Sequence, residues 1–193
     1  VSLSFQPDSR IGKKTRDKVL KIAKQLNYFP NLAARDLRSG RTKTIGFVIN
    51  DITNPFYGMM VRTSEQIAMD RGYEIIFAES QWSAKHEQII INKMLQSRIE
   101  GIILCFSEQD DRAYKLVQTS ALPHIVVDTR PEFYNGAYVI NDGWHAGYLS
   151  AKHLFEIGCR KIAVLNAKKE LGVFSSVKFM EEGFERYVRE QNH

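Results

Sequence analysis

Cysteine is scarce in this 193-residue sequence, which contains only Cys105 and Cys159. Two isolated cysteines cannot build a disulfide framework and lack metal-ligand spacing, so we expect no metal site and a reduced, cytoplasmic setting. Long apolar runs are also missing, because "GIILCF" (101–106) is typical of the longest and a membrane span needs about 18 apolar residues. The N-terminus has no basic start followed by an apolar block, so the sequence indicates neither a signal peptide nor a membrane partner.

Motifs for nucleotide chemistry and catalysis are missing as well. The first apolar run is followed by "NDITNPFYG" rather than G-x-G-x-x-G, and "SGRTKT" lacks the spacing of a P-loop. The histidines form no metal-ligand pattern and stand beside no obvious nucleophile; they are His86, His124, His145, His153 and His193. The sequence therefore argues against an enzyme and gives no sign of a bound cofactor.

Charge is unevenly distributed along the chain. Residues 1–43 hold eleven Lys or Arg against three acidic residues, a net charge of +8, whereas the remaining 150 residues hold sixteen against nineteen, a net charge of −3. A basic arm on a mildly acidic body points to a polyanionic partner at one end only. On charge alone, the alternative is a basic helix that is simply solvated.

Two helices are expected within the basic arm. Apolar residues recur at helical spacing from Lys13 to Leu26. A second, short helical stretch lies between Pro30 and Gly40, with Asn31 as a plausible N-cap. A helix this short is marginal in water by itself, so we expect it to fold mainly on a partner.

Beyond residue 44, short β-rich runs alternate with longer helical ones. We expect strands at 44–49, 73–78, 101–106, 124–128, 137–140 and 161–165, and helices at about 57–71, 84–98, 109–119, 143–157 and 177–190. Near-continuous apolar strands separated by helices are typical of a parallel sheet covered on both faces. The sequence therefore predicts a doubly wound α/β body, with Gly72 and Gly158 ending two of its helices.

An ordered set of motifs occupies about the first 57 residues. It comprises Val1-Ser2, Thr15-Arg16, Val19, Leu26, Tyr28, Pro30-Asn31, Ala34, Leu37-Arg38, Thr44-Ile45-Gly46 and Asp51 to Phe56. In this order the motifs resemble the LacI/GalR (lactose-repressor) family of bacterial transcription regulators. The likeness continues more loosely through "RIEGIIL", "VVD" and "INDGWHAGYLSAKHLFEIGCRKIAVL". It implies a sequence-specific DNA-binding regulator, expected to be a repressor, that a small-molecule effector controls.

The resemblance also implies a domain organisation. Residues 1–30 would be a partial, all-α helix-turn-helix headpiece, and 31–43 a hinge helix and linker. Residues 44–159 would form the N-terminal lobe of an effector-binding domain of periplasmic-binding-protein type, and 160–193 the start of its C-terminal lobe, with 161–165 as the first strand. Because the sequence also starts without a methionine, we expect it to be part of a longer protein.

DNA contacts are expected from the headpiece and the hinge helix. In this family the hinge helices of a homodimer pair in the minor groove of a near-palindromic operator, where a leucine wedges between base steps and kinks the duplex. Motif position makes Leu37 that leucine, and the expected contact residues are Ser2, Arg16, Asn31, Ala34, Arg35, Leu37 and Arg38. An ordinary interdomain linker is the alternative for this segment.

Effector contacts are expected from the loops that follow the strands, namely from Asp51, Phe56, Tyr57, Trp82, Asp128 and Asp142. An aromatic wall with a carboxylate suits a sugar or sugar derivative. The alternatives are that Phe56 and Tyr57 are core residues and that Trp82 packs on the surface. Met180 stands where many family members carry an arginine, and Lys178 should point off another helix face, so the effector's identity stays open. The alternative function is a sugar-binding protein that never touches DNA.

Overall fold

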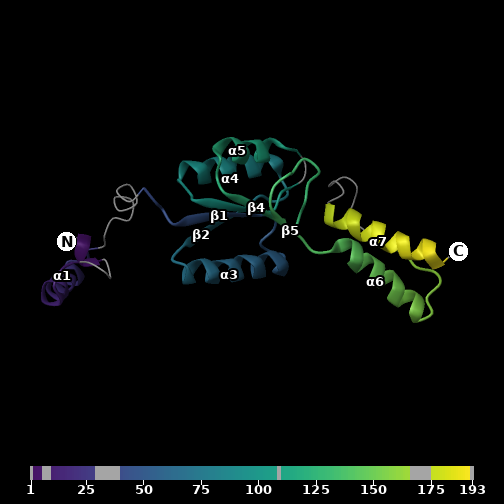
Figure 1. The fold of residues 1–193 in the computed structure, drawn as a ribbon, viewed down its shortest axis with the longest axis horizontal. Helices are drawn as coiled ribbons and strands as arrows, with labels where there is room; N and C mark the ends of the chain where they lie inside the picture. Colours follow the sequence, from purple (N-terminus) through teal and green to yellow (C-terminus); the bar gives the residue numbers. More distant parts are fainter. Residues whose placement is uncertain (1, 6–9, 29–39, 108–109, 166–174, 192–193) are drawn as a thin grey trace. The chain divides into compact units, whose positions relative to one another are not determined.

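A computed structural model of the chain describes residues 2–5, 10–28, 40–107, 110–165 and 175–191 (Figure 1). The chain divides into two compact units, Val1–Thr42 and Lys43–His193. None of the helices in the described ranges is long and apolar enough to cross a membrane.

The first unit contains a short 3-10 helix, η1 (Ser2–Phe5), and the helix α1 (Lys13–Gln25). The predicted helix at Lys13–Leu26 is thus confirmed to within one residue, and residues 2–5 form a single tight 3-10 turn. The Arg16 side chain fastens α1 to η1, because its Nε donates to the backbone oxygen of Ser4 over 3.1 Å. The lysines of α1 lie exposed on its surface.

The second unit is built on a five-stranded sheet in the order β2-β1-β3-β4-β5. Its strands are β1 (Thr44–Ile49), β2 (Glu74–Glu79), β3 (Gly101–Leu104), β4 (His124–Val127) and β5 (Tyr138–Val139). All four strand pairings are parallel, with Ile45 of β1 opposite Ile75 on one side and Gly101 on the other. The predicted parallel α/β sheet is confirmed, and strand order reverses between β1 and β3, as doubly wound folds require.

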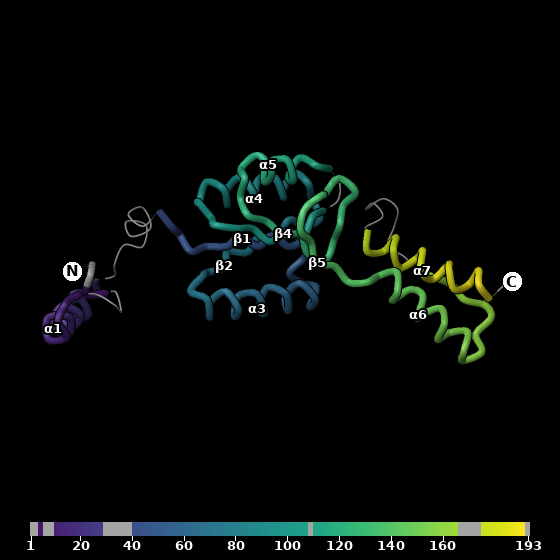
Figure 2. The backbone as a smooth tube through the Cα atoms, in the orientation of Figure 1, coloured from purple at the N-terminus to yellow at the C-terminus, as the bar shows by residue number. Residues whose placement is uncertain are grey.

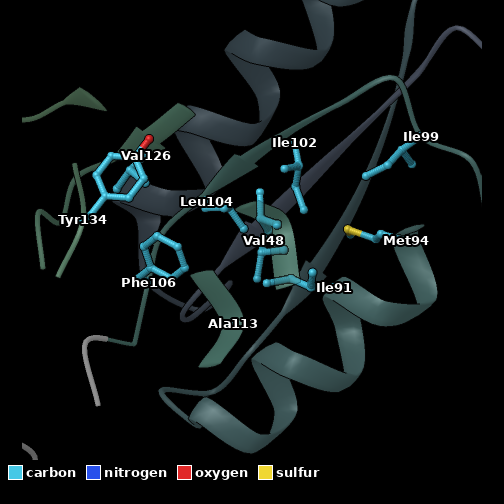
Figure 3. Close-up of a cluster of buried hydrophobic side chains, with 11 residues drawn as sticks. Val48, Ile91, Met94, Ile99, Ile102, Leu104, Phe106, Ala113, Val126 and Tyr134 are labelled. Carbon is cyan, nitrogen blue, oxygen red and sulfur yellow. The ribbon is translucent and has the colours of Figure 1, made fainter. Parts of the chain in front are cut away.

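Helices cover both faces of this sheet (Figure 1). They are α3 (Pro55–Asp70) on one face, and α4 (Ala84–Gln96) and α5 (Arg112–Ser120) on the other. Alternate residues of β1 serve the two sides, since Phe47 and Ile49 pack in the cluster of α3, and Val48 packs in the cluster of α4 and α5 (Figure 3). Both clusters are almost fully withdrawn from solvent, which makes the sheet a rigid base for the loops at its ends.

The chain then forms two long helices, α6 (Gly143–Glu156) and α7 (Ser175–Gln191), which run side by side in the same direction (Figure 2). Glycines allow the close approach: a Cβ atom on Gly147 would meet the backbone of Met180, and one on Gly183 would meet the backbone of Trp144. The Tyr148 hydroxyl bonds the Glu190 carboxylate of α7 over 2.9 Å and secures the pair further along.

Two helices of the second unit end at glycines. Gly72 and Gly158 follow the ends of α3 and α6 with φ of +73° and +92°, which confirms the prediction that they end these helices.

The prediction of a strand at 161–165 is wrong, because no described strand pairs with this segment and its backbone is irregular. Val164 and Leu165 are 54% and 97% exposed. An apolar run becomes a strand only beside a hydrogen-bonding neighbour, which the described residues do not supply.

The glycine contact between α6 and α7 leads to a stability prediction. Gly147→Ala should lower the free energy of unfolding by about 1–3 kcal/mol, because the new methyl group must push α7 away. Gly58→Ala is the matched control, since Gly58 lies inside α3 with nothing near its Cβ position, and it should raise stability by up to about 1 kcal/mol through helix propensity. Urea denaturation followed by circular dichroism measures both. Equal effects of the two substitutions would contradict the close helix packing.

Candidate functional site

Buried polar side chains gather where the strands end, at the carboxyl edge of the sheet. Asn50 directly follows β1 and Ser80 directly follows β2, and both are fully buried. The Ser80 hydroxyl donates to Asn50 Oδ1 over 2.9 Å, and Asn50 Nδ2 donates to the backbone oxygen of Phe106 over 3.3 Å. The loops after β1, β2 and β3 are therefore tied together beneath the surface.

The loop after β4 is bonded into the same edge. Thr129 is buried, and its hydroxyl accepts from the backbone N–H of Phe106 over 3.2 Å. Its neighbour Asp128 adopts a left-handed conformation, with φ of +68°. Such a conformation costs a non-glycine residue on the order of 1 kcal/mol, so the surrounding hydrogen bonds must hold it in place.

One of those bonds joins Asp128 to α3. The hydroxyl of Tyr57, the third residue of α3, donates to Asp128 Oδ2 over 2.9 Å. Burial raises the pKa of the Tyr57 hydroxyl well above its usual range, and the negative charge of Asp128 raises it further. Burial likewise raises the pKa of Asp128, against the lowering effect of the hydrogen bond from Tyr57. The second Asp128 oxygen can still accept a hydrogen bond, as a carboxylate offers about four acceptor sites.

Aromatic rings flank this pair. Trp82 lies edge-on to Tyr57 at 6.2 Å between ring centroids, and Phe56 lies edge-on to Tyr57 at 5.5 Å. Gln81 and Trp82, which follow β2, are both left-handed, with φ of +54° and +57°, and the Trp82 side chain packs against the buried cluster that contains Tyr57. Tyr57 is 2% exposed and Phe56 is 40% exposed. Tyr57 is thus a core residue whose hydroxyl bonds Asp128, whereas the Phe56 ring is partly open to solvent.

The other two candidate carboxylates have local partners. Asp51 accepts from the backbone N–H and the hydroxyl of Thr53, over 2.8 and 2.6 Å, and these bonds lower the pKa of its carboxyl group. Asp142 caps α6 by accepting from the backbone N–H of His145 over 2.9 Å. The structure thus brings Phe56, Tyr57, Trp82 and Asp128 together. Asp51 is engaged in the loop after β1, and Asp142 caps α6.

A buried glutamate under the same edge was missed by the sequence reasoning. Glu87, in the first turn of α4, is 1% exposed, and its Oε2 accepts from the backbone N–H of Ser107 over 2.8 Å. Burial raises the pKa of Glu87 to about 7, and the bond from Ser107 opposes the rise. A signal was available, because Glu87 lies four and seven residues before Ile91 and Met94 on the buried face of α4. Asn50, Ser80 and Thr129 could have been found as polar residues adjoining buried strands.

A cavity of about 550 Å³ lies between the loop after β4 and the first turn of α7. Its lining residues are Arg130, Pro131, Glu132, Phe133, Tyr134, Ser175, Lys178 and Phe179. Lys178 lines this cavity and donates to Glu132 Oε1 over 3.2 Å, so it points off another face of α7 than Met180, as expected. Met180 does not line it and is 49% exposed.

The candidate DNA contacts are only partly visible. Arg16 bonds Ser4 as described above, and Ser2 lies in η1. The remaining candidates, which are Asn31, Ala34, Arg35, Leu37 and Arg38, lie outside the described residues.

In the described ranges, no group of three or more His, Cys, Asp or Glu side chains could hold a metal ion.

A parallel α/β sheet with a polar and aromatic carboxyl edge is shared by many ligand-binding domains, among them those of the periplasmic-binding-protein type. Residues 42–191 match the family described as "Periplasmic binding proteins and sugar binding domain of LacI family". The chain belongs to this family, so the resemblance seen in its motifs is confirmed.

Curated relatives of the chain are transcriptional regulators, not enzymes. The chain is 26% identical over 185 residues to the HTH-type transcriptional repressor PurR of Histophilus somni (strain 129Pt), covering 94% of this chain and 54% of that protein. It is 32% identical over 163 residues to Catabolite control protein A of Staphylococcus xylosus, covering 84% of this chain and 50% of that protein. The chain therefore spans about half the length of the curated relatives it matches.

Solved structures agree on the fold. The Cra transcriptional dual regulator from Pseudomonas putida, in complex with fructose 1-phosphate, has a TM-score of 0.69 and 27% identity, over 77% of this chain and 54% of that chain. A LacI-family transcriptional regulator from Silicibacter pomeroyi has a TM-score of 0.80 at 21% identity, over 99% of this chain and 57% of that chain. The latter shows the fold alone.

The buried Glu87 predicts a pH dependence of stability. Its folded pKa of about 7 lies above the ordinary value of 4.5, so the unfolded chain ionises first as pH rises and the folded state loses stability from about pH 4.5 to 7. Glu87→Gln keeps an acceptor for Ser107 but cannot ionise. The free energy of unfolding of Glu87→Gln minus that of the wild type should therefore increase by about 2 kcal/mol between pH 5 and pH 8.

Urea denaturation at the two pH values measures this difference. Glu156→Gln on α6 is the matched control, because the Glu156 side chain is 59% exposed, and its difference from wild type should stay constant. A Glu87→Gln difference that does not change with pH would show that the carboxyl group is not held neutral by burial.

Proposed function

We propose that the chain belongs to a transcriptional regulator of the LacI/GalR type, most simply a repressor, whose DNA binding is controlled by a small-molecule effector. The observation that carries this proposal is the family match over residues 42–191 joined to a basic arm of net charge +8 in residues 1–43. A sugar-binding protein that never touches DNA has no use for such an arm. The named relatives, which are transcriptional regulators, support the same function.

The proposed DNA-binding part comprises a partial helix-turn-helix headpiece in residues 1–30 and a hinge helix and linker in 31–43. The exposed lysines of α1 supply positive charge for phosphates. Ser2, Arg16, Asn31, Arg35 and Arg38 are the proposed polar contacts. Ala34 and Leu37 are the proposed minor-groove residues, with Leu37 as the wedge.

The proposed effector-binding part comprises an N-terminal lobe in residues 44–159 and the start of a second lobe in 160–193. Tyr57 and Asp128 form its polar centre, because the Asp128 carboxylate is held by Tyr57 and keeps acceptor sites for a hydroxyl group. Phe56 and Trp82 are the proposed stacking surfaces for a sugar ring, and Asp51 and Asp142 are proposed contacts at the rim. The fructose 1-phosphate bound to the Cra regulator supports a sugar derivative as the class of effector.

A homodimer in the cytoplasm is the proposed working form. Two headpieces match two half-sites of a near-palindromic operator, and paired hinge helices stabilise each other. In addition, large apolar side chains are 49–70% exposed on α3 and on the adjoining edge strand β2; they are Met59, Ile67, Met69, Ile76 and Phe77. Burial of such a surface against a second copy would favour association.

Leu37→Ala in the full-length protein should weaken specific operator binding and reduce DNA bending, because alanine is too small to stay wedged between base pairs. Loss of a few kcal/mol of wedge contacts would lower operator affinity by at least tenfold. A circular-permutation bending assay and an electrophoretic titration measure the two effects. Leu149→Ala, at a leucine that is 46% exposed on α6 and outside the proposed DNA-binding part, is the control. An unchanged bend in Leu37→Ala would contradict the minor-groove assignment.

The full-length protein should bind one near-palindromic operator as a homodimer. Sedimentation equilibrium with and without a labelled operator gives the stoichiometry, and a half-site duplex serves as the control. The protein should bind the half-site duplex more weakly by several orders of magnitude, since only one of its two headpieces can contact the DNA. A monomer bound at one copy per operator would refute the dimer.

A further inference from the structure

The cavity between the loop after β4 and α7 has the size of a small-molecule site. Its volume of about 550 Å³ falls within the range of about 300–1,000 Å³ that is usual for ligand pockets. Two different elements build its walls, with Arg130 to Tyr134 on one side and Ser175 to Phe179 on the other. A ligand in it would therefore contact both the loop after β4 and the start of α7.

Positive charge dominates the polar lining. Arg130 and Lys178 contribute two cations, one from each wall, and Glu132 is the acidic residue among the lining side chains. The Arg130 guanidinium lies 4.3 Å from the centroid of the Tyr138 ring. A guanidinium over an aromatic face is held in place yet keeps the donors at its edge for an anion.

The Lys178 ammonium is held only loosely by its acidic neighbour. Its bond to Glu132 spans 3.2 Å, but the two side chains are 51% and 91% exposed. Exposed pairs of this kind contribute little free energy. An incoming anion can therefore replace Glu132 as the partner of the ammonium, and the exposed Glu132 carboxylate can be solvated by water instead.

Backbone groups complete the arrangement. The N–H of Arg130 donates to the Ser175 hydroxyl over 2.9 Å, which joins the loop to the first residue of α7. The positive end of the α7 dipole lies at this residue and favours negative charge near the cavity. Phe133 and Phe179 supply an apolar wall. The Tyr134 hydroxyl is engaged with the backbone oxygen of Ala137 over 2.8 Å.

We propose that this cavity binds the anionic group of the effector, a carboxylate or a phosphate, with Arg130 and Lys178 as its two anchors. The assignment deepens the proposed function and rests on it, because it assigns a charge to the effector of the same domain. Arg130 follows Asp128 by two residues, so one ligand can place a hydroxyl at Asp128 and its anionic group at the cavity. A neutral sugar would leave both cations without a ligand partner.

The test compares matched neutral and anionic probes on the full-length protein by isothermal titration calorimetry. The pairs are fructose with fructose 1-phosphate and glucose with glucuronate, and inorganic phosphate alone is the fifth probe. At least one anionic member should bind ten times more tightly than its neutral partner. A preference for fructose 1-phosphate assigns a phosphate, and a preference for glucuronate assigns a carboxylate.

Charge-removing variants locate the site. Lys178→Gln and Arg130→Gln should each lower the affinity for the anionic probe by about 10- to 100-fold, the usual effect of losing one hydrogen bond to a charged group. The affinity for its neutral partner should change by less than threefold. Lys152→Gln is the matched control, because Lys152 is a half-exposed lysine on α6 that does not line the cavity. It should change neither affinity.

Three results would overturn the proposal: equal or tighter binding of the neutral members, unchanged affinity in both anchor variants, or binding by none of the five probes. Operator binding is measured on the same preparation, so that failure of the anion site can be distinguished from failure of the proposed regulatory function. If the protein binds its operator but prefers the neutral sugars, the anion site is wrong and the regulator stands. If the operator is not bound, the proposed function itself fails.

Discussion

Three consecutive residues after β4 carry the connections on which the domain depends. Asp128 receives a hydrogen bond from Tyr57 of α3, Thr129 receives one from the backbone of Phe106 after β3, and Arg130 donates one to Ser175 of α7. Each residue thus faces a different element, and the left-handed turn at Asp128 makes this possible by rotating the chain within one residue. A local conformational cost on the order of 1 kcal/mol is offset by three bonds that no regular strand end could make together. The segment is therefore a junction rather than a simple connection.

Parallel pairing explains why this junction can also be a binding site. Because β1, β2, β3 and β4 all run in the same direction, the loops that follow them emerge at one edge. Asn50 and Ser80 are buried there with their side chains bonded to each other. A satisfied buried polar network fixes one geometry, since any shift leaves a donor or acceptor without a partner. The Tyr57 and Asp128 groups are consequently held in one arrangement, so the effector proposed to bind them would not have to order them.

Sequence reasoning predicted most of the fold and several residues that the structure brings together in the candidate site. Five of the six expected strands and all five expected helices of the body are present, because the strands are short apolar runs and the helices carry apolar residues at helical spacing. The strand prediction for residues 161–165 was wrong because an apolar run does not reveal whether a neighbouring strand exists. Tyr57, Trp82 and Asp128 were placed correctly at one edge by the parallel-sheet rule, yet the partnership of Tyr57 with Asp128 joins residues 71 positions apart and leaves no local trace. Glu87 was overlooked because an acidic residue on an apolar helix face is read as solvated unless its neighbours at i+4 and i+7 are counted.

The junction also explains how a ligand signal could travel through the domain. Asp128 belongs to the contact with α3, whereas Arg130 belongs to the contact with α7, and only Thr129 separates them. An effector that bonds both residues would favour one relative position of α3 and α7 over others, in proportion to its difference in affinity for the two positions. The tight glycine contact between α6 and α7 prevents these helices from absorbing the movement by sliding apart. The two helices would move as one body, and a small displacement at Ser175 would therefore be carried along the full length of α7.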